Sequence, residues 1–355
     1  MELDKVLRAR GITRKEFLRW CTATAAALGL SELYAPKVAA AVAEAAKKPP
    51  VIWIKGQDCT GCTESALSDL SPSPEQLVLD LLSFRYHPTI MAASGEVAQQ
   101  AFRDAVKEGG YLLVVEGSIP GADDRFTMEA GEPFVRHLRE ASRNAVAVVA
   151  AGSCAAYGGI PAAGPTKARG VSHFVQDKPV INLPSCPVKP SRLVGTVMHY
   201  LMFKRLPALD EVGRPVPYYG FLQHDNCPRR GHYERGELLA DWNDPAQSQY
   251  CLLLKGCKGP VTYTDCSQLW WNDGANYCIN AGSPCSGCTQ PEFYAGFSPL
   301  YQRQEQFKLP GIGGVNTSTV GGVMVGATAV AMAGHAVLRA VRGGGEQAGK
   351  GDGAE

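Results

Sequence analysis

The chain has 355 residues, 45% of them hydrophobic, a formal net charge of +1 and twelve cysteines. This length allows two domains with their own cores, the apolar content argues against disorder, and the balanced charge gives no sign of a nucleic-acid partner held by bulk electrostatics. The cysteine count is the unusual feature, because a chain this long does not need disulfides in place of a core.

The first 46 residues predict an export signal. Basic residues in TRKEFLRW are followed by the uncharged residues 20–31, a stretch too short to span a bilayer. Residues 13–18 resemble a twin-arginine export signal in which Lys15 replaces the second arginine. An amphipathic N-terminal helix is the alternative interpretation.

Residues 50–205 alternate short apolar segments with helical ones. Strands are predicted at 51–55, 111–117, 145–152 and 179–184, and helices at 89–106, 132–143 and 190–203. Fully apolar strands are typical of a parallel sheet that is covered on both faces. The pattern therefore predicts an α/β domain with an open parallel sheet and helices on both sides.

Four cysteines follow the ends of these predicted strands. Cys59 and Cys62 come after the first strand, Cys154 after the third and Cys186 after the fourth. The carboxyl ends of parallel strands lie at one edge of the sheet, where such folds bind ligands. The sequence therefore predicts a site with four thiolates at that edge.

From about residue 206 to 305 the β-α alternation stops, and seven cysteines lie among loops. A segment with so few apolar runs needs a cross-link to replace the missing core. Disulfides cannot pair all eleven cysteines that remain when Cys21, in the export segment, is set aside, and C-x-x-C spacing favours a shared metal. Zinc and iron–sulfur clusters both accept four thiolates, with histidine as a substitute, so both stay open.

The eleven cysteines and one histidine divide into three sets of four along the chain. His224 joins the cysteines because it has the x-x spacing of a ligand pair with Cys227. The first set is Cys59, Cys62, Cys154 and Cys186; the second is His224, Cys227, Cys251 and Cys257; the third is Cys266, Cys278, Cys285 and Cys288.

The C-terminal region predicts a membrane anchor. No charged residue occurs between Lys308 and Arg339, and residues 315–341 are long enough for a transmembrane helix. Arg339 and Arg342 suit a cytoplasmic end by the positive-inside rule. Residues 343–355 are expected to form a flexible polar tail. A buried helix of a soluble protein is the alternative for the apolar stretch.

Six motifs give the chain a family resemblance: CTGCTES, GSCAAYGG, PSCPVKP, HDNCPR, GCKGPVTY and SPCSGCTQPEFY. In this order and spacing, over residues 50 to 303, they resemble the small subunit of an exported, membrane-bound nickel–iron hydrogenase. The resemblance implies a flavodoxin-like N-terminal domain and an irregular iron–sulfur domain. It also implies a large subunit whose nickel–iron site splits hydrogen, a location on the periplasmic side of the cell membrane, and an electron acceptor that is soluble or, like a cytochrome b, in the membrane.

The same resemblance assigns a cluster to each set. The first set corresponds to the proximal [4Fe–4S] ligands, and the His224 set to the distal [4Fe–4S] ligands. The third set corresponds to the medial cluster, which in most relatives is a three-thiolate [3Fe–4S], with proline at the position of Cys278. We predict that Cys278 is the fourth ligand of a medial [4Fe–4S] cluster; a buried free thiol is the alternative.

Three further interpretations accompany this assignment. Glu64 is a candidate proton-path residue where the large subunit would bind, or an ordinary glutamate at a helix start. A rival function from another class is a zinc-stapled binding module with no redox role. A second rival is a quinone-reductase-type subunit of related fold with one cluster, against which residues 206–303 argue.

Overall fold

The computed structural model describes residues 50–68, 82–203, 205–302, 307–309, 313–315 and 317–347, with single positions at 19, 22, 35 and 73. The predicted export signal, residues 1–46, therefore lies almost wholly outside the described residues. The chain divides into two units, Met1–Gln302 and Arg303–Glu355.

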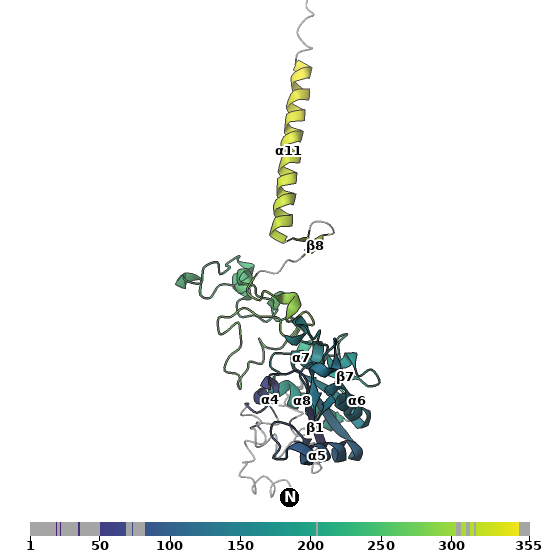
Figure 1. Ribbon diagram of the computed structural model, residues 1–355. Helices are drawn as coiled ribbons and strands as arrows, with labels where there is room; N and C mark the ends of the chain where they lie inside the picture. Colours follow the sequence, from purple (N-terminus) through teal and green to yellow (C-terminus); the bar gives the residue numbers. More distant parts are fainter. Residues whose placement is uncertain are drawn as a thin grey trace, which may run out of the picture. The chain divides into compact units, whose positions relative to one another are not determined.

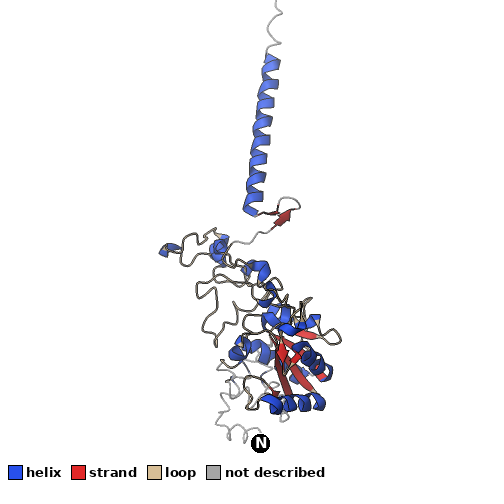
Figure 2. Ribbon diagram, viewed as in Figure 1, coloured by secondary structure: helices blue, strands red, loops and turns tan. Residues whose placement is uncertain are grey.

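The first unit contains one five-stranded sheet, and its neighbouring strands are all parallel (Figures 1 and 2). The strand order is β2-β1-β3-β6-β7, which is the flavodoxin-like order 2-1-3-4-5 when the five strands are counted along the chain. The predicted fold class is confirmed. The strands are β1 (Pro50–Lys55), β2 (Ser83–Tyr86), β3 (Tyr111–Glu116), β6 (Ala145–Ala151) and β7 (Val180–Leu183).

Helices cover both faces of this sheet because alternate strand residues are apolar on each side. Val51 and Trp53 belong to one buried cluster, which also contains residues of α8 (Pro190–Phe203). Ile52 and Ile54 belong to the other cluster, which contains residues of α5 (Gly95–Glu108) and α6 (Phe134–Asn144). Two short helices, α4 (Gly61–Ala66) and α7 (Gly152–Tyr157), follow the carboxyl ends of β1 and β6.

Two details differ from the prediction. The helix expected at 89–106 begins only at Gly95, because Ser94 is extended and Gly95 has φ +57°, which a continuous right-handed helix does not contain. The edge strand β2 was not predicted, since its four residues are too few to show a periodic pattern. The other predicted strands and helices agree with the structure to within about two residues.

Residues 206–302 contain only short helical turns, as the sequence predicted. Their buried apolar cluster consists of Leu239, Leu252, Tyr277 and Ile279. The helices are α9 (Val216–Tyr219), α10 (Arg230–Glu234), η6 (Pro245–Gln247), η7 (Leu252–Lys255), η8 (Gly259–Val261) and η9 (Ala295–Phe297). The remaining short elements of this unit are η3 (Asp124–Phe126), β4 (Met128–Glu129), β5 (Glu132–Pro133), η4 (Pro161–Ala163) and η5 (Val171–His173).

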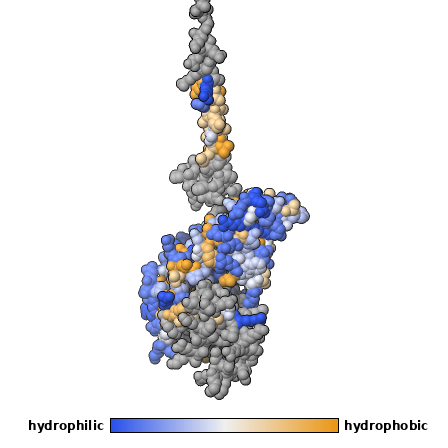
Figure 3. All heavy atoms as spheres, turned by 180° about the vertical axis from the view of Figure 1, so that it is seen from behind, coloured by the Kyte–Doolittle hydropathy of each residue, from blue (hydrophilic) through white to orange (hydrophobic). Residues whose placement is uncertain are grey.

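The second unit contains a hairpin of β8 (Phe307–Leu309) and β9 (Gly313–Val315), followed by α11 (Thr317–Gln347). Within the described residues, α11 is the helix that is long and apolar enough to cross a membrane, with mean hydropathy 1.3 over Gly322–Arg339. Its visible side is largely apolar (Figure 3). Residues 343–347, expected in the flexible tail, are helical, because an existing helix propagates easily through a few poor helix formers.

Candidate functional site: three sets of cysteines

The first set of cysteines gathers at the carboxyl edge of the parallel sheet. Cys59 precedes α4 and Cys62 lies in it, Cys154 lies in α7 directly after β6, and Cys186 follows β7. Burial, and then the charges of Cys186 and Cys59, raise the pKa of the Cys154 thiol to about 12. The structure thus places at one edge of the sheet the four cysteines that the sequence predicted there from their positions after strand ends.

Two glycines make room for these thiols. A Cβ atom at Gly152 would collide with the Cys62 sulfur, and one at Gly159 would lie 2.8 Å from the Cys154 sulfur. Both glycines have positive φ, +85° and +54°, which other residues rarely adopt. The backbone therefore leaves space on the side to which the thiols point.

Backbone and carboxylate groups hold the Cys62 turn in place. The Val188 N–H donates a hydrogen bond of 3.3 Å to the Cys62 sulfur. The buried carboxylate of Glu116 accepts hydrogen bonds from the backbone N–H groups of Cys62 (3.0 Å) and Thr63 (3.2 Å). Sequence reasoning missed Glu116, although a charged residue at the end of an apolar strand was a usable signal. Glu64 stands exposed in the first turn of α4.

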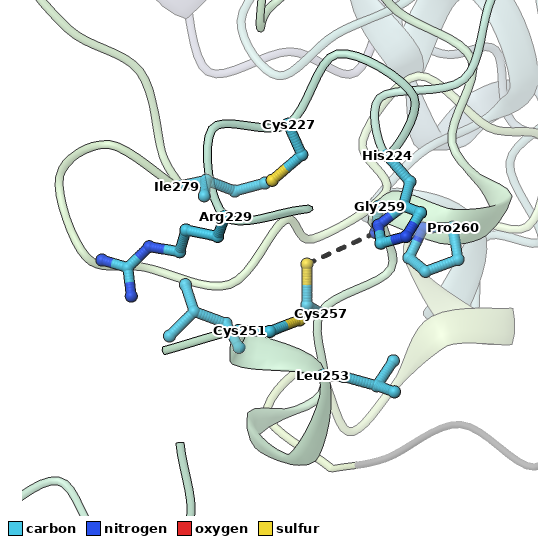
Figure 4. A pocket seen from close by; sticks show the side chains of 10 residues that line it. His224, Cys227, Arg229, Cys251, Leu253, Cys257, Gly259, Pro260 and Ile279 are labelled. Atoms are coloured by element: carbon cyan, nitrogen blue, oxygen red, sulfur yellow. Dashed lines mark hydrogen bonds between the residues drawn. The ribbon is translucent and has the colours of Figure 1, made fainter. Parts of the chain in front are cut away.

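The second set lines a single pocket in residues 206–302. His224, Cys227, Cys251 and Cys257 surround it, together with the apolar side chains of Leu252 and Ile279 (Figure 4). The Gly259 N–H donates a hydrogen bond of 3.5 Å to the Cys257 sulfur. Burial, and then the charge of Arg230, lower the pKa of His224, which favours the neutral imidazole that a metal requires.

The third set includes Cys278, for which the sequence left two interpretations open. Burial raises the pKa of the Cys278 thiol, and the charge of Cys266 raises it further. Burial is the main cause that raises the pKa of the Cys288 thiol to about 12, and the charges of Cys266 and Cys278 contribute to this rise. Burial, and then the charges of Cys257 and Cys288 and to a lesser extent Cys266, raise the pKa of the Cys285 thiol well above its usual value. By the surface of the whole residue Cys278 is the exposed member of this set, although neighbouring groups desolvate its thiol.

The surroundings of the third set fit a sulfur-rich group. The Thr264 hydroxyl lies 3.2 Å from the Cys266 sulfur, to which the Trp271 indole N–H donates a hydrogen bond of 3.4 Å. Within the described part of the chain, the buried hydroxyl of Ser267 has no hydrogen-bond partner. A buried donor needs an acceptor, and thiolate or inorganic sulfur would supply one.

Hydrogen bonds connect the three sets in the order first, third, second. The Ser153 hydroxyl, next to Cys154 of the first set, donates a hydrogen bond to the Cys288 carbonyl, and the Cys186 backbone lowers the pKa of the Cys288 thiol. The Cys285 N–H in turn donates a hydrogen bond of 3.4 Å to the Cys257 sulfur. The third set therefore lies between the other two.

The donor set fits the iron–sulfur interpretation, although four thiolates, or three with an imidazole, also suit zinc. The eleven described cysteines are free thiols. Among the residues that the structure describes, no three His, Cys, Asp or Glu side chains lie close enough to hold one metal ion. Thiolates supported by N–H donors, with one neutral imidazole, are the ligand chemistry of iron–sulfur clusters, so the residues present fit such groups.

Comparison with known proteins gives two family matches and several similar chains. The family model for the C-terminal part of NiFe/NiFeSe hydrogenase small subunits matches residues 219–301, and that for the 20 Kd subunit of NADH ubiquinone oxidoreductase matches residues 59–200.

The uptake hydrogenase small subunit of Azotobacter vinelandii is 38% identical over 343 residues, 95% of each chain. The quinone-reactive Ni/Fe-hydrogenase small chain of Wolinella succinogenes is 39% identical over 94% of this chain and 97% of that one. The Ni-Fe-Se hydrogenase structure from Desulfomicrobium baculatum is similar with a TM-score of 0.68, at 36% identity, over 72% of this chain and 100% of that one.

Proposed function

Since the chain belongs to the family of nickel–iron hydrogenase small subunits, we propose that it relays electrons through three iron–sulfur clusters between the large subunit's nickel–iron site and a membrane acceptor. The observation that carries this proposal is the series of three ligand sets, in which a hydrogen bond joins the chain segments of each set to those of the next. A relay needs such a series because electrons cross a protein only over short gaps.

Each ligand set has its own place in the proposed relay. Cys59, Cys62, Cys154 and Cys186 would hold the proximal [4Fe–4S] cluster, in a flavodoxin-like domain of residues 50–205. Cys266, Cys278, Cys285 and Cys288 would hold the medial cluster, and His224, Cys227, Cys251 and Cys257 the distal [4Fe–4S] cluster, in a domain of residues 206–305. When bound, the clusters supply one-electron transfer.

Two ligands give the relay its expected asymmetry. Cys278 would be a fourth medial thiolate, which makes that cluster [4Fe–4S]; its coupling to Cys266 and Cys288 supports this. His224 is a neutral ligand in place of an anionic thiolate, so it should raise the reduction potential of the distal site. Electrons would therefore be drawn toward the site from which they leave.

Localisation and partners extend the same proposal. The apolar helix α11 would anchor the chain in the membrane, with the clusters on the periplasmic side after export by the twin-arginine-type signal. The quinone-reactive relative supports a membrane acceptor, for which a cytochrome b is our candidate. Glu64, exposed beside the first set, would move protons at the interface with the large subunit.

One alternative draws on a specific observation. The match of residues 59–200 to the NADH ubiquinone oxidoreductase 20 Kd family agrees with a single-cluster quinone-reductase-type subunit. The second match, at residues 219–301, covers the two further ligand sets and favours the hydrogenase function.

Metal analysis of the purified heterodimer tests the proposal. We expect about thirteen irons per heterodimer, of which about twelve belong to the clusters and one to the nickel–iron site, with about twelve acid-labile sulfides and a brown absorbance that dithionite bleaches. About twelve irons would indicate a three-iron medial cluster, and about five a single-cluster subunit. A colourless protein containing zinc would show that the relay assignment is wrong.

A further inference from the structure

A buried arginine links the parallel-sheet domain to the third ligand set. Arg192, on α8, is 0% exposed. Its guanidinium pairs with the carboxylate of Asp265, through Nε at 3.0 Å and through a shorter contact from Nη2. Nη2 also donates hydrogen bonds to the Thr264 hydroxyl at 2.6 Å and to the Cys266 sulfur at 3.4 Å.

A second buried cation faces the carboxylate that pairs with this arginine. Lys189, which is also buried, has its ammonium 3.8 Å from the same Asp265 carboxylate and donates to the Leu269 carbonyl. Two buried cations therefore face one buried carboxylate. Excess charge away from water is costly unless an opposite charge lies near it. The Cys266 thiolate, within hydrogen-bonding distance of Arg192, supplies that negative charge once it binds iron.

The same guanidinium contacts the chain segment that leads to the first set. Arg192 Nη1 donates a hydrogen bond of 3.2 Å to the carbonyl of Pro184, two residues before Cys186. One side chain thus bonds the backbone before a ligand of the first set and the sulfur of a ligand in the third. This arrangement fixes the two ligand segments relative to each other.

We propose that Arg192 is a positioning residue of the electron relay: it orients Cys266 and raises the reduction potential of the cluster bound at the third set. The inference rests on the proposed function, because it needs a cluster on Cys266. A cation and a hydrogen bond at a ligating sulfur withdraw electron density and favour the reduced, more negative form of the cluster. Arg192 would thereby offset the lower potential that the additional thiolate of Cys278 brings.

The test is a potentiometric titration of the purified heterodimer, followed by electron paramagnetic resonance. Arg192→Met should shift the medial midpoint potential to lower values. Arg192→Lys should shift it less, because lysine keeps the positive charge but lacks the planar guanidinium and its several N–H donors. Asp265→Asn should shift it to higher values, because it removes the neighbouring negative charge. The proximal and distal potentials should change much less. The matched control is Arg103→Met on the exposed face of α5, which makes the same charge change without effect on the medial potential.

The opposite directions of the two shifts separate a charge effect from a loss of structure, since loosening of the site has no reason to reverse sign at Asp265. If Arg192→Met does not assemble, Arg192→Lys and Asp265→Asn decide the question. An unchanged or lowered medial potential in Asp265→Asn overturns the inference. A wild-type heterodimer that shows no third cluster overturns the proposed function instead.

Discussion

The indole N–H of Trp53 donates a hydrogen bond of 3.0 Å to the carboxylate of Glu116, on the neighbouring strand β3. That carboxylate also accepts the two backbone N–H groups at the start of α4, and the Lys55 ammonium lies 3.7 Å away. A buried carboxylate is stable only when it is paired and hydrogen-bonded in this way. Glu116 therefore attaches the Cys62 turn to the centre of the sheet.

We expect Glu116→Gln to weaken this attachment. The glutamine amide can accept through only one atom, and its NH₂ group would face the N–H groups that the carboxylate now accepts. The free energy of unfolding should fall by about 1–3 kcal/mol, and the first set should lose iron more readily. Denaturant unfolding and iron content measure the two effects. The control is Glu108→Gln, which removes only an exposed pair with Arg85 and should change little; equal behaviour of the two variants would contradict this role.

Substitution of Cys278 tests its place as a ligand. In the oxidised heterodimer we expect no stoichiometric three-iron signal in electron paramagnetic resonance, whereas Cys278→Pro should produce one. Proline offers no ligating atom and fixes the backbone φ at this position. A strong three-iron signal in undamaged wild-type protein would mean that Cys278 is not a ligand.

Removal of iron should affect the two halves of the first unit differently. The buried apolar cluster of residues 206–302 has only four members, whereas the sheet has large clusters on both faces. After chelation under reducing conditions, we expect the amides of Leu239 and Cys251, now hydrogen-bonded, to exchange at nearly the rate of an unfolded chain. Amides of β3 and β6 should remain protected. Retained protection at Leu239 would show that the irregular domain is stable without its clusters.

Stability should depend on pH through His87. Burial, and then the nearby charge of Lys55, lower the pKa of His87 from 6.5 to about 4. Because the folded state disfavours the protonated ring, this histidine's contribution is complete above about pH 6.5 and is lost as the pH falls to about 4. The difference corresponds to about 3 kcal/mol. We expect the free energy of unfolding of His87→Phe, whose ring can still stack on Trp53, to fall less over this range.

The control for this experiment is His173→Gln, a substitution at an exposed position. Its stability should follow the wild-type protein at each pH. Parallel curves for wild type and His87→Phe between pH 4 and 7 would contradict the assignment to His87.

Deletion of residues 317–355 tests the anchor. We expect the truncated subunit, together with its large subunit, to move from the membrane fraction to the soluble fraction while it still reduces dyes with hydrogen. The apolar residues of α11 are exposed over Gly322–Arg339, so their removal takes away a surface that lipid would cover. A truncated heterodimer that stays with the membranes would locate the attachment elsewhere.

The sheet and the ligand sets could be predicted because their signals are local. Runs such as 145–151 contain only Ala and Val, and C-x-x-C spacing is visible within four residues. The supports of the sites could not be predicted in this way. Glu116 lies 54 residues from Cys62, and Arg192 lies 73 residues from Asp265, so only the folded chain brings them together. The start of α5 was mispredicted for a related reason, since the φ of Gly95 depends on the turn before it.

The hydrogen bonds between ligand segments also limit how such a protein can be redesigned. Because the Cys285 N–H donates to the Cys257 sulfur and the Ser153 hydroxyl donates to the Cys288 carbonyl, each ligand set depends on a hydrogen bond with a neighbouring set. If one ligand set were moved alone into another scaffold, its side chains and backbone would lose the hydrogen-bond partners that the neighbouring set provides. Inserting a residue into one ligand loop would likewise disturb its neighbour. The three ligand sets of this subunit should therefore be transferred to another protein together.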